Sequence, residues 1–190
     1  AVIVAVSHND CADNGLVLPP AVAPIQAIVV PVAQHKEGVL EKANELTERL
    51  KKVCRAKIDD SDNSPGWKFA EYEMKGVPVR VEIGPKDIEK NQCVVVTRHN
   101  REKTFVSLDD IETVILEKLE EVRQGLYDSA LENRERRTYV AKTLDDITKQ
   151  LEEHGDGFVK AMWCGSEECE EKVKEITGVG SRCIPLEQEN

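Results

Sequence analysis

The segment IQAIVVPV at residues 25–32, which is apolar except for Gln26, constrains the fold of this chain more than any other segment. A run rich in β-branched residues favours a strand that is buried on both faces, as in a sheet covered by helices. Residues 38–53 follow with apolar side chains at helical spacing, which predicts an amphipathic helix with Leu40, Leu46 and Leu50 facing inward. This pair of elements favours an α/β fold in which helices flank a mixed sheet.

The segment GWKFAEYEMKGVPVRVEIGPKD, residues 66–87, gathers most of the chemistry that the sequence offers. Its first half has helical spacing, which places Phe69 and Glu73 within about one turn of each other. Its second half alternates valine and isoleucine with other residues, so Arg80 and Glu82 are expected on one face of a strand. Glycine turn signals frame that strand and leave the residues after it in a loop, where ligand contacts are common.

The rest of the chain carries further strand and helix patterns, followed by a small terminal α/β domain. The expected elements are two strands within residues 1–24, a strand at 53–58, a basic hairpin formed by 92–97 and 104–108, a long helix over 110–133, a charged boundary at 134–138, an acidic helix over 144–154 and a short helix ending at Ile176.

Charge and length restrict the classes of function. A length of 190 residues allows one large or two small domains, and a net charge of −10 argues against a protein that coats nucleic acid without specificity. The charge of residues 66–103 differs from that of the whole chain, because this segment contains eight Lys or Arg and six Asp or Glu and so has a net charge of +2. The apolar start at residues 1–6 is too short for a signal peptide or a membrane span, so we expect a cytoplasmic protein with reduced thiols and no membrane association.

The side chains in residues 66–87 suit the recognition of guanine in single-stranded RNA. A carboxylate such as Glu73 or Asp87 can accept both donors of the guanine Watson–Crick edge, while Arg80 and Lys86 can reach base edges or phosphates. Phe69 offers an apolar ring on which an unstacked base can lie. The alternative is a solvated charged surface whose ion pairs contribute only about 0–1 kcal/mol each, and spacing alone leaves both interpretations open.

Four sequence blocks together resemble one family over almost the whole chain. They are GLVLPP at 15–20, VAPIQAIVVPV at 22–32, GWKFAEYEMKGVPVRVEIGPKDIE at 66–89, and WCGSEEC with SRCIP within 163–185. These blocks are similar to prolyl-tRNA synthetases of the archaeal and eukaryotic type, which are class II enzymes. The resemblance implies three parts: the tail of the catalytic domain at 1–24, an anticodon-binding domain at 25–135 and a C-terminal, zinc-binding-like domain at 136–190.

The resemblance also implies a function for the intact protein. Such an enzyme uses ATP, with Mg²⁺, to attach proline to tRNA(Pro) through prolyl-adenylate, and it works as a homodimer. The class II motifs would precede Ala1, so we expect no catalytic residue within this chain. The positions that match the family's readers of the two anticodon guanines are Phe69, Glu73, Arg80, Lys86 and Asp87.

One segment departs from the family pattern. His8 is followed by NDCADN before GLVLPP, where the family has two residues fewer, and Ala21 stands where the family has arginine. We therefore assign no role to His8 or Asp10, and a polar loop is the favoured interpretation of His8, Asp10 and Asp13.

The cysteines suggest a metal site that is incomplete. Cys164 and Cys169 could supply two thiolates to zinc, but a structural zinc site needs four ligands, and Cys183 is the only further thiol nearby. Free thiols are therefore favoured over bound zinc, and Cys11, Cys54 and Cys93 are expected to be buried or half-buried.

Two rival functions remain. The first is a non-catalytic RNA-binding subunit built on the same domain. The messenger RNA sequence upstream of the codon for Ala1 would distinguish it from the enzyme, because class II motifs there support the enzyme and a nearby start codon supports the subunit. The second is a thiol or metal module built on Cys164 and Cys169.

Overall fold

The computed structural model describes residues 15–155 and 157–184, which form two compact units divided between Ala130 and Leu131. The sequence predicts domain limits after residues 24 and 135. These limits differ from the division into two units and stay predictions. The strand expected at residues 1–6 lies outside the described residues, as do His8, Asp10, Cys11 and Asp13.

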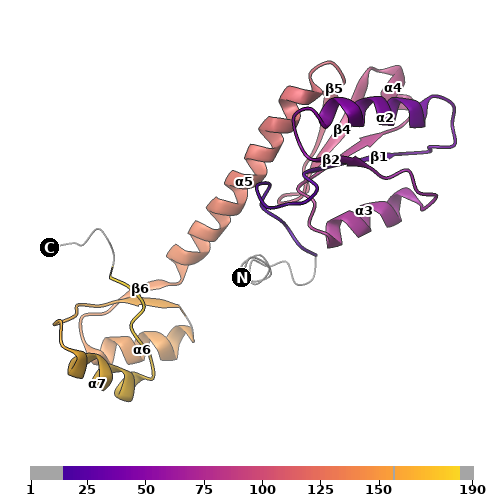
Figure 1. Cartoon of the computed structure of the whole chain (residues 1–190). Helices are drawn as coiled ribbons and strands as arrows, with labels where there is room; N and C mark the ends of the chain where they lie inside the picture. Colours follow the sequence, from indigo (N-terminus) through magenta and orange to yellow (C-terminus); the bar gives the residue numbers. More distant parts are fainter. Residues whose placement is uncertain (1–14, 156, 185–190) are drawn as a thin grey trace. The chain divides into compact units, whose positions relative to one another are not determined.

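Unit 1 is built on a five-stranded sheet with the strand order β2-β1-β3-β4-β5 (Figure 1). The strands are β1 (Ala27–Pro31), β2 (Ala56–Ile58), β3 (Val79–Ile83), β4 (Gln92–Thr97) and β5 (Lys103–Ser107). Strand β1 pairs in parallel with β2 and β3, whereas the β3–β4 and β4–β5 pairs are antiparallel. The predicted mixed sheet and its basic hairpin are therefore confirmed.

Helices cover the two faces of this sheet unequally. Helices α2 (Val39–Leu50), α4 (Pro85–Glu89) and α5 (Ile111–Arg136) contribute to the main core, which buries the alternating apolar residues of β3, β4 and β5. Helix α3 (Pro65–Met74) packs on the opposite face, where a second cluster joins Ile28 and Val30 to Tyr72 and Val77 (Figure 1). That cluster includes residues of β1 but none from the described residues of β4 or β5.

Two details of the sequence-based expectations are wrong. Leu40 is 37% exposed, because α2 buries the helix face that carries Val39, Ala43, Leu46 and Leu50, and Leu40 does not lie on that face. The second strand expected before the double proline is absent from residues 15–19, where Leu18 instead donates one backbone hydrogen bond to the Gly76 carbonyl at 3.0 Å.

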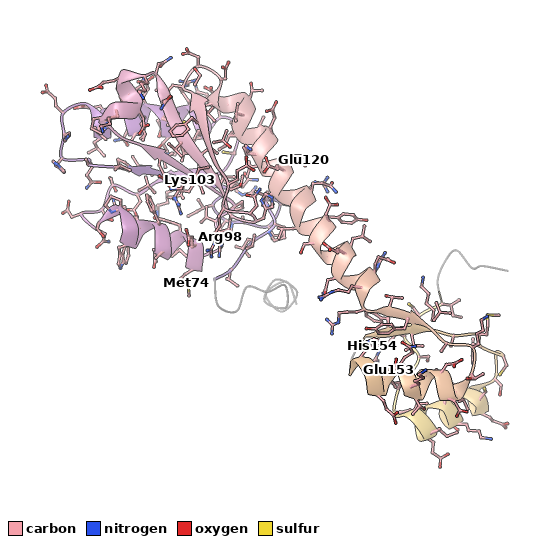
Figure 2. The ribbon with its side chains drawn as sticks, turned by 180° about the vertical axis from the view of Figure 1, so that it is seen from behind. Met74, Arg98, Lys103, Glu120, Glu153 and His154 are labelled. Carbon is pink, nitrogen blue, oxygen red and sulfur yellow. The ribbon has the colours of Figure 1, made fainter. Side chains whose placement is uncertain are left out.

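Unit 2 combines a parallel two-stranded sheet with two helices, the small α/β domain that the sequence predicts. Its elements are β6 (Thr138–Val140), α6 (Leu144–His154), β7 (Phe158–Lys160) and α7 (Glu167–Thr177). Thr143 and Asp146 cap α6 reciprocally at 3.0 and 3.1 Å, and the His154 ring, marked in Figure 2, stacks on Tyr139 with centroids 4.2 Å apart. None of the described helices has the length and apolar character of a membrane span.

Candidate nucleic-acid interface

The local sequence explains how α3 and β3 present their polar side chains. Helix α3 starts after Ser64, whose Oγ accepts from the Trp67 N–H at 3.4 Å, and Pro65 occupies the first helical position. The turn after α3 needs Gly76, because its φ is +70° and an added Cβ would lie 2.8 Å from the Leu16 Cβ. Strand β3 then buries every second side chain, and Arg80, which lies between two of them, points to the face of the sheet on which α3 packs.

Arg80 is the centre of a polar cluster that joins the two elements. Its Nη1 donates to Glu73 Oε1 at 2.9 Å, and its Nε donates to Glu82 Oε1 at 3.0 Å. The guanidinium carbon also lies 4.0 Å from the centroid of the Phe69 ring. Because the Arg80 side chain is only 11% exposed, these charges interact in a partly water-free setting where pairing is stronger than on an open surface.

The expected role of the Phe69 ring, a surface on which a base can lie, stays a prediction beside its contact with Arg80. One face of the ring is covered by the guanidinium, so a base arriving on that side meets Arg80 first. A guanidinium plane is itself a good stacking surface for a nucleobase. Phe69 therefore supports the arginine plane in this structure.

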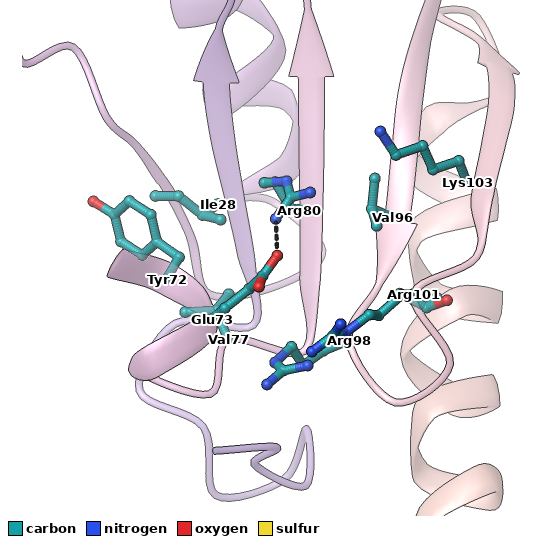
Figure 3. A pocket seen from close by; sticks show the side chains of 10 residues that line it. Ile28, Tyr72, Glu73, Val77, Arg80, Val96, Arg98, Arg101 and Lys103 are labelled. Atoms are coloured by element: carbon teal, nitrogen blue, oxygen red, sulfur yellow. Dashed lines mark hydrogen bonds and ion pairs between the residues drawn. The ribbon is translucent and has the colours of Figure 1, made fainter. Parts of the chain in front are cut away.

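A cavity of about 180 Å³ opens beside this cluster, between α3 and the β4–β5 hairpin (Figure 3). It is smaller than the roughly 300–1,000 Å³ of pockets that enclose a whole small molecule, so it suits one flat group presented from outside. Its lining includes one carboxylate, Glu73, and four cationic side chains: Arg80, Arg98, Arg101 and Lys103. This local positive charge contrasts with the net −10 of the chain and favours a ligand that carries phosphate.

Lys86 and Asp87 lie apart from the Arg80 cluster. They belong to α4, which begins beyond the last residue of β3, whereas Arg80 is the second residue of that strand. Strand geometry puts about 10 Å between Arg80 and the end of β3. The Asp87 Oδ2 accepts from the Gly84 N–H at 3.0 Å, so this carboxylate already closes the first turn of α4.

Helix α3 also carries a buried lysine, Lys68, whose contacts were not predicted from the sequence. Lys68 is 1% exposed, and its Nζ donates to Gln34 Oε1 and to the Asp59 carbonyl, both at 2.9 Å. Burial alone would raise the pKa of Asp59, but hydrogen bonds from Ser61 and the charge of Lys68 bring that pKa below its ordinary value. Burial and the same carboxylate raise the pKa of Tyr72 to about 12.

The sequence-based prediction also missed Arg98, Arg101 and Lys103, which come from the hairpin. Arg98 and Lys103, both marked in Figure 2, lie on this part of unit 1. The basic character of residues 98–103 was visible in the sequence, but their convergence with Glu73 depends on strand register. Lys103 lies opposite Val96 on β4, and Val96 lies opposite Arg80 on β3.

Two of the three cysteines of unit 2, Cys164 and Cys169, interact with each other. Cys164 and Cys169 are exposed and share a hydrogen bond, while the backbone of Ser166 and that bond lower the pKa of Cys164. The hydrogen bond and the nearby Cys164 raise the pKa of Cys169. Among residues 15–155 and 157–184, no group of three or more Cys, His, Asp or Glu side chains converges in a metal-binding geometry.

We expect purified chain to hold zinc well below one ion per molecule, because two thiolates are half of a tetrahedral ligand set. The measurement is metal content after dialysis against buffer without metal. Replacing both Cys164 and Cys169 with serine should leave RNA affinity unchanged, and Cys54→Ser serves as a control for the loss of a thiol elsewhere. Stoichiometric zinc that disappears in the double variant would contradict the expectation.

Two protein-family models match the chain. Residues 26–118 match the model described as an anticodon binding domain, and residues 144–190 match the model described as the prolyl-tRNA synthetase C-terminal domain. The two matches lie between residue 26 and residue 190 and leave residues 119–143 between them.

Similar proteins and structures point to the same family. The chain is 58% identical to a proline–tRNA ligase of Clostridium botulinum (strain 657 / Type Ba4) and 59% identical to that of Ruminiclostridium cellulolyticum, each over 182 residues. These matches cover 96% of this chain and 37% of each relative, so the chain spans little more than a third of the relatives' length.

A solved structure is similar over most of the chain. The crystal structure of prolyl-tRNA synthetase from Cryptosporidium parvum, complexed with L-proline and AMP, matches with a TM-score of 0.85 and 38% identity, over 92% of this chain and 38% of that chain. The chain therefore belongs to the prolyl-tRNA synthetase family and corresponds to the C-terminal portion of its members, with an anticodon-binding domain followed by the family's C-terminal domain.

Proposed function

We propose that the intact protein is a proline–tRNA ligase that attaches proline to tRNA(Pro) through prolyl-adenylate, and that unit 1 reads the guanines of the anticodon. ATP, Mg²⁺, a homodimeric assembly and a cytoplasmic location belong to the same proposal for the intact protein. The catalytic role is assigned to the intact protein, and the RNA-reading role to the residues described here.

One observation carries the proposal for unit 1: a carboxylate, a stacked guanidinium and a cationic cavity meet at one place in an anticodon-binding domain. Glu73 supplies the acceptor that the guanine Watson–Crick edge needs, and Arg80 supplies both a donor and a flat face. Arg101 and Lys103 are exposed on the far wall of the cavity and can meet the phosphates that flank the base.

We assign one guanine to each carboxylate. Glu73 lies beside the cavity, and Asp87 lies beyond the other end of β3 with exposed Lys86 next to it. Two adjacent bases that are splayed apart could each meet one carboxylate. This division explains why the five predicted residues form two groups.

The proposal is tested by titrating the chain with anticodon stem-loops of tRNA(Pro) in which either guanine is replaced by adenine. At one stated salt concentration, each replacement should weaken binding by about 5- to 150-fold, the equivalent of 1–3 kcal/mol for a paired base contact. Equal affinity for all three loops would refute anticodon reading by this chain.

Variants assign the effect to named carboxylates. Glu73→Ala and Asp87→Ala should each remove the preference at one of the two guanine positions. Glu71→Ala is the matched control for Glu73, since Glu71 lies on the same helix with 34% side-chain exposure against 33% and pairs with Lys75 instead. A loss of preference in Glu71→Ala as large as in Glu73→Ala would remove Glu73 from the site.

A further inference from the structure

The face of the sheet that carries Arg80 continues past the cavity along β4 and β5. The strand register places Glu82 opposite Val94 and Val94 opposite Phe105, one row along from the Arg80, Val96 and Lys103 row. Because side chains alternate along a strand, Lys103 and Phe105 share one face of β5. The second row therefore continues the surface that begins at the cavity.

Phe105 stands out within this row. Its side chain is 68% exposed, although phenylalanine usually gains about 1.5–3 kcal/mol from burial. The helix on this face, α3, packs on β1, and its cluster contains no described residue of β5. A lone exposed apolar residue is common on protein surfaces, so exposure by itself assigns no function.

Two further observations point to a ligand of defined chemistry. The first is continuity, since Phe105 lies two residues, or about 7 Å, along β5 from cavity-lining Lys103. That span is roughly twice the 3.4 Å rise between stacked bases, so a nucleotide next to one bound in the cavity can reach the ring. The second is charge, because the exposed cations Arg101 and Lys103 lie between the ring and the hairpin turn.

We propose that Phe105 is a stacking platform for the base of an unpaired nucleotide that is next to the two adjacent guanines of the anticodon. The proposal rests on the proposed function of unit 1 and extends it by one nucleotide. An aromatic ring stacks any base, so this contact adds affinity without adding sequence preference. Lys103 can contact the phosphate between the two bases.

The test is the affinity of the chain for the anticodon stem-loop with both guanines intact. Phe105→Ala should weaken binding by about 5- to 150-fold, Phe105→Leu should recover little of the loss, and Phe105→Trp should bind as wild type. The slope of affinity against salt should not change, because no charge is removed. Tyr127→Ala is the matched control, since Tyr127 is another aromatic residue with 58% exposure and lies on α5.

A second arm identifies the nucleotide. Stem-loops carrying an abasic site on either side of the guanine pair are titrated against wild type and Phe105→Ala. With one of them, the two proteins should bind equally, because the base that stacks on Phe105 is missing. A loss in Phe105→Ala that is the same on intact and both abasic loops, or no loss at all, overturns the proposal.

This result is distinguishable from failure of the proposed function. Guanine preference is a ratio of affinities for two RNAs with one protein, whereas the Phe105 effect is a difference between two proteins on one RNA. Wild type without guanine preference would refute the proposed function, whatever Phe105→Ala does. If Phe105 instead forms a contact with a second copy of the chain, Phe105→Ala will change the sedimentation of the RNA-free protein. That result would also overturn the proposal.

Discussion

Arg80→Met should weaken binding of the guanine-containing stem-loop by about 10- to 100-fold, whereas Arg80→Lys should recover less than half of that loss in free energy. Arg80 makes three contacts at once, with Glu73, Glu82 and the Phe69 ring. Methionine fills similar space but leaves both carboxylates without a cation. Lysine restores charge, but it cannot donate in two fixed directions and stack as a plane.

Stability should fall together with affinity, and the two effects can be separated. Glu82 is 13% exposed, so an unpaired charge there should cost about 1–3 kcal/mol of the free energy of unfolding. Adding Glu82→Gln to Arg80→Met removes that charge and should restore most of the stability. Affinity should stay low, because the arginine plane and its hold on Glu73 are still missing.

The control for Arg80 is Arg123→Met. Arg123 also pairs with a glutamate, Glu120, but it is 51% exposed on α5, where such pairs contribute little. Its loss should change neither binding nor unfolding. Wild-type affinity in Arg80→Met, measured at the same salt, would mean that Arg80 does not contribute to RNA binding.

Local patterns in the sequence predicted the elements of this site. The period-two alternation after Gly76 identified β3 and put Arg80 and Glu82 on one face, and helical spacing brought Phe69 and Glu73 together on α3. Both signals act over a few residues, where geometry follows from backbone periodicity alone. The error at Leu40 concerns the same periodicity, because the buried face follows the i, i+4, i+7, i+11 spacing of Val39, Ala43, Leu46 and Leu50, and Leu40 lies one position off that face.

Contacts between distant segments could not be predicted in the same way. Lys103 joins the cavity through the register of two antiparallel pairs, which depends on the whole sheet. The position of Arg80 over Phe69 depends on how α3 packs against β1 and β3. The burial of Lys68 is the least predictable, because lysine on a helix is normally solvated and only the loops at 34 and 59 supply its acceptors.

Lys68→Met should lower the free energy of unfolding by about 2–4 kcal/mol, a fall in Tm on the order of 10 °C for a chain of this size. The side chain is 1% exposed, so its ammonium is stabilised by Gln34 and Asp59 in place of water. Methionine has a similar length and removes the charge. The buried Asp59 carboxylate, 3.8 Å from Nζ, then lacks a cation.

Lys75→Met is the matched control within the same segment. Lys75 follows α3 directly, is 54% exposed and pairs with Glu71 at 2.6 Å. Such an exposed pair contributes about 0–1 kcal/mol, so thermal or urea unfolding should hardly change. Equal destabilisation by the two substitutions would show that the buried contacts of Lys68 add no more stability than the exposed pair of Lys75.

The pH dependence of this difference identifies Asp59 as the partner. In the folded wild type, the pKa of Asp59 lies below its ordinary value of 3.8, so the carboxylate adds stability above about pH 4 that is lost as pH falls through the folded pKa. Without Lys68, the hydrogen bonds from Ser61 remain, but one of the effects that oppose burial is lost, so the protonated acid is favoured more than in the wild type. The difference in free energy of unfolding between wild type and Lys68→Met should therefore be full at pH 7 and smaller at pH 3. Asp59→Asn in the variant background should remove most of this pH dependence.

Since α3 carries both Lys68 and Glu73, Lys68→Met should also weaken guanine preference, whereas the Lys75→Met control should retain it.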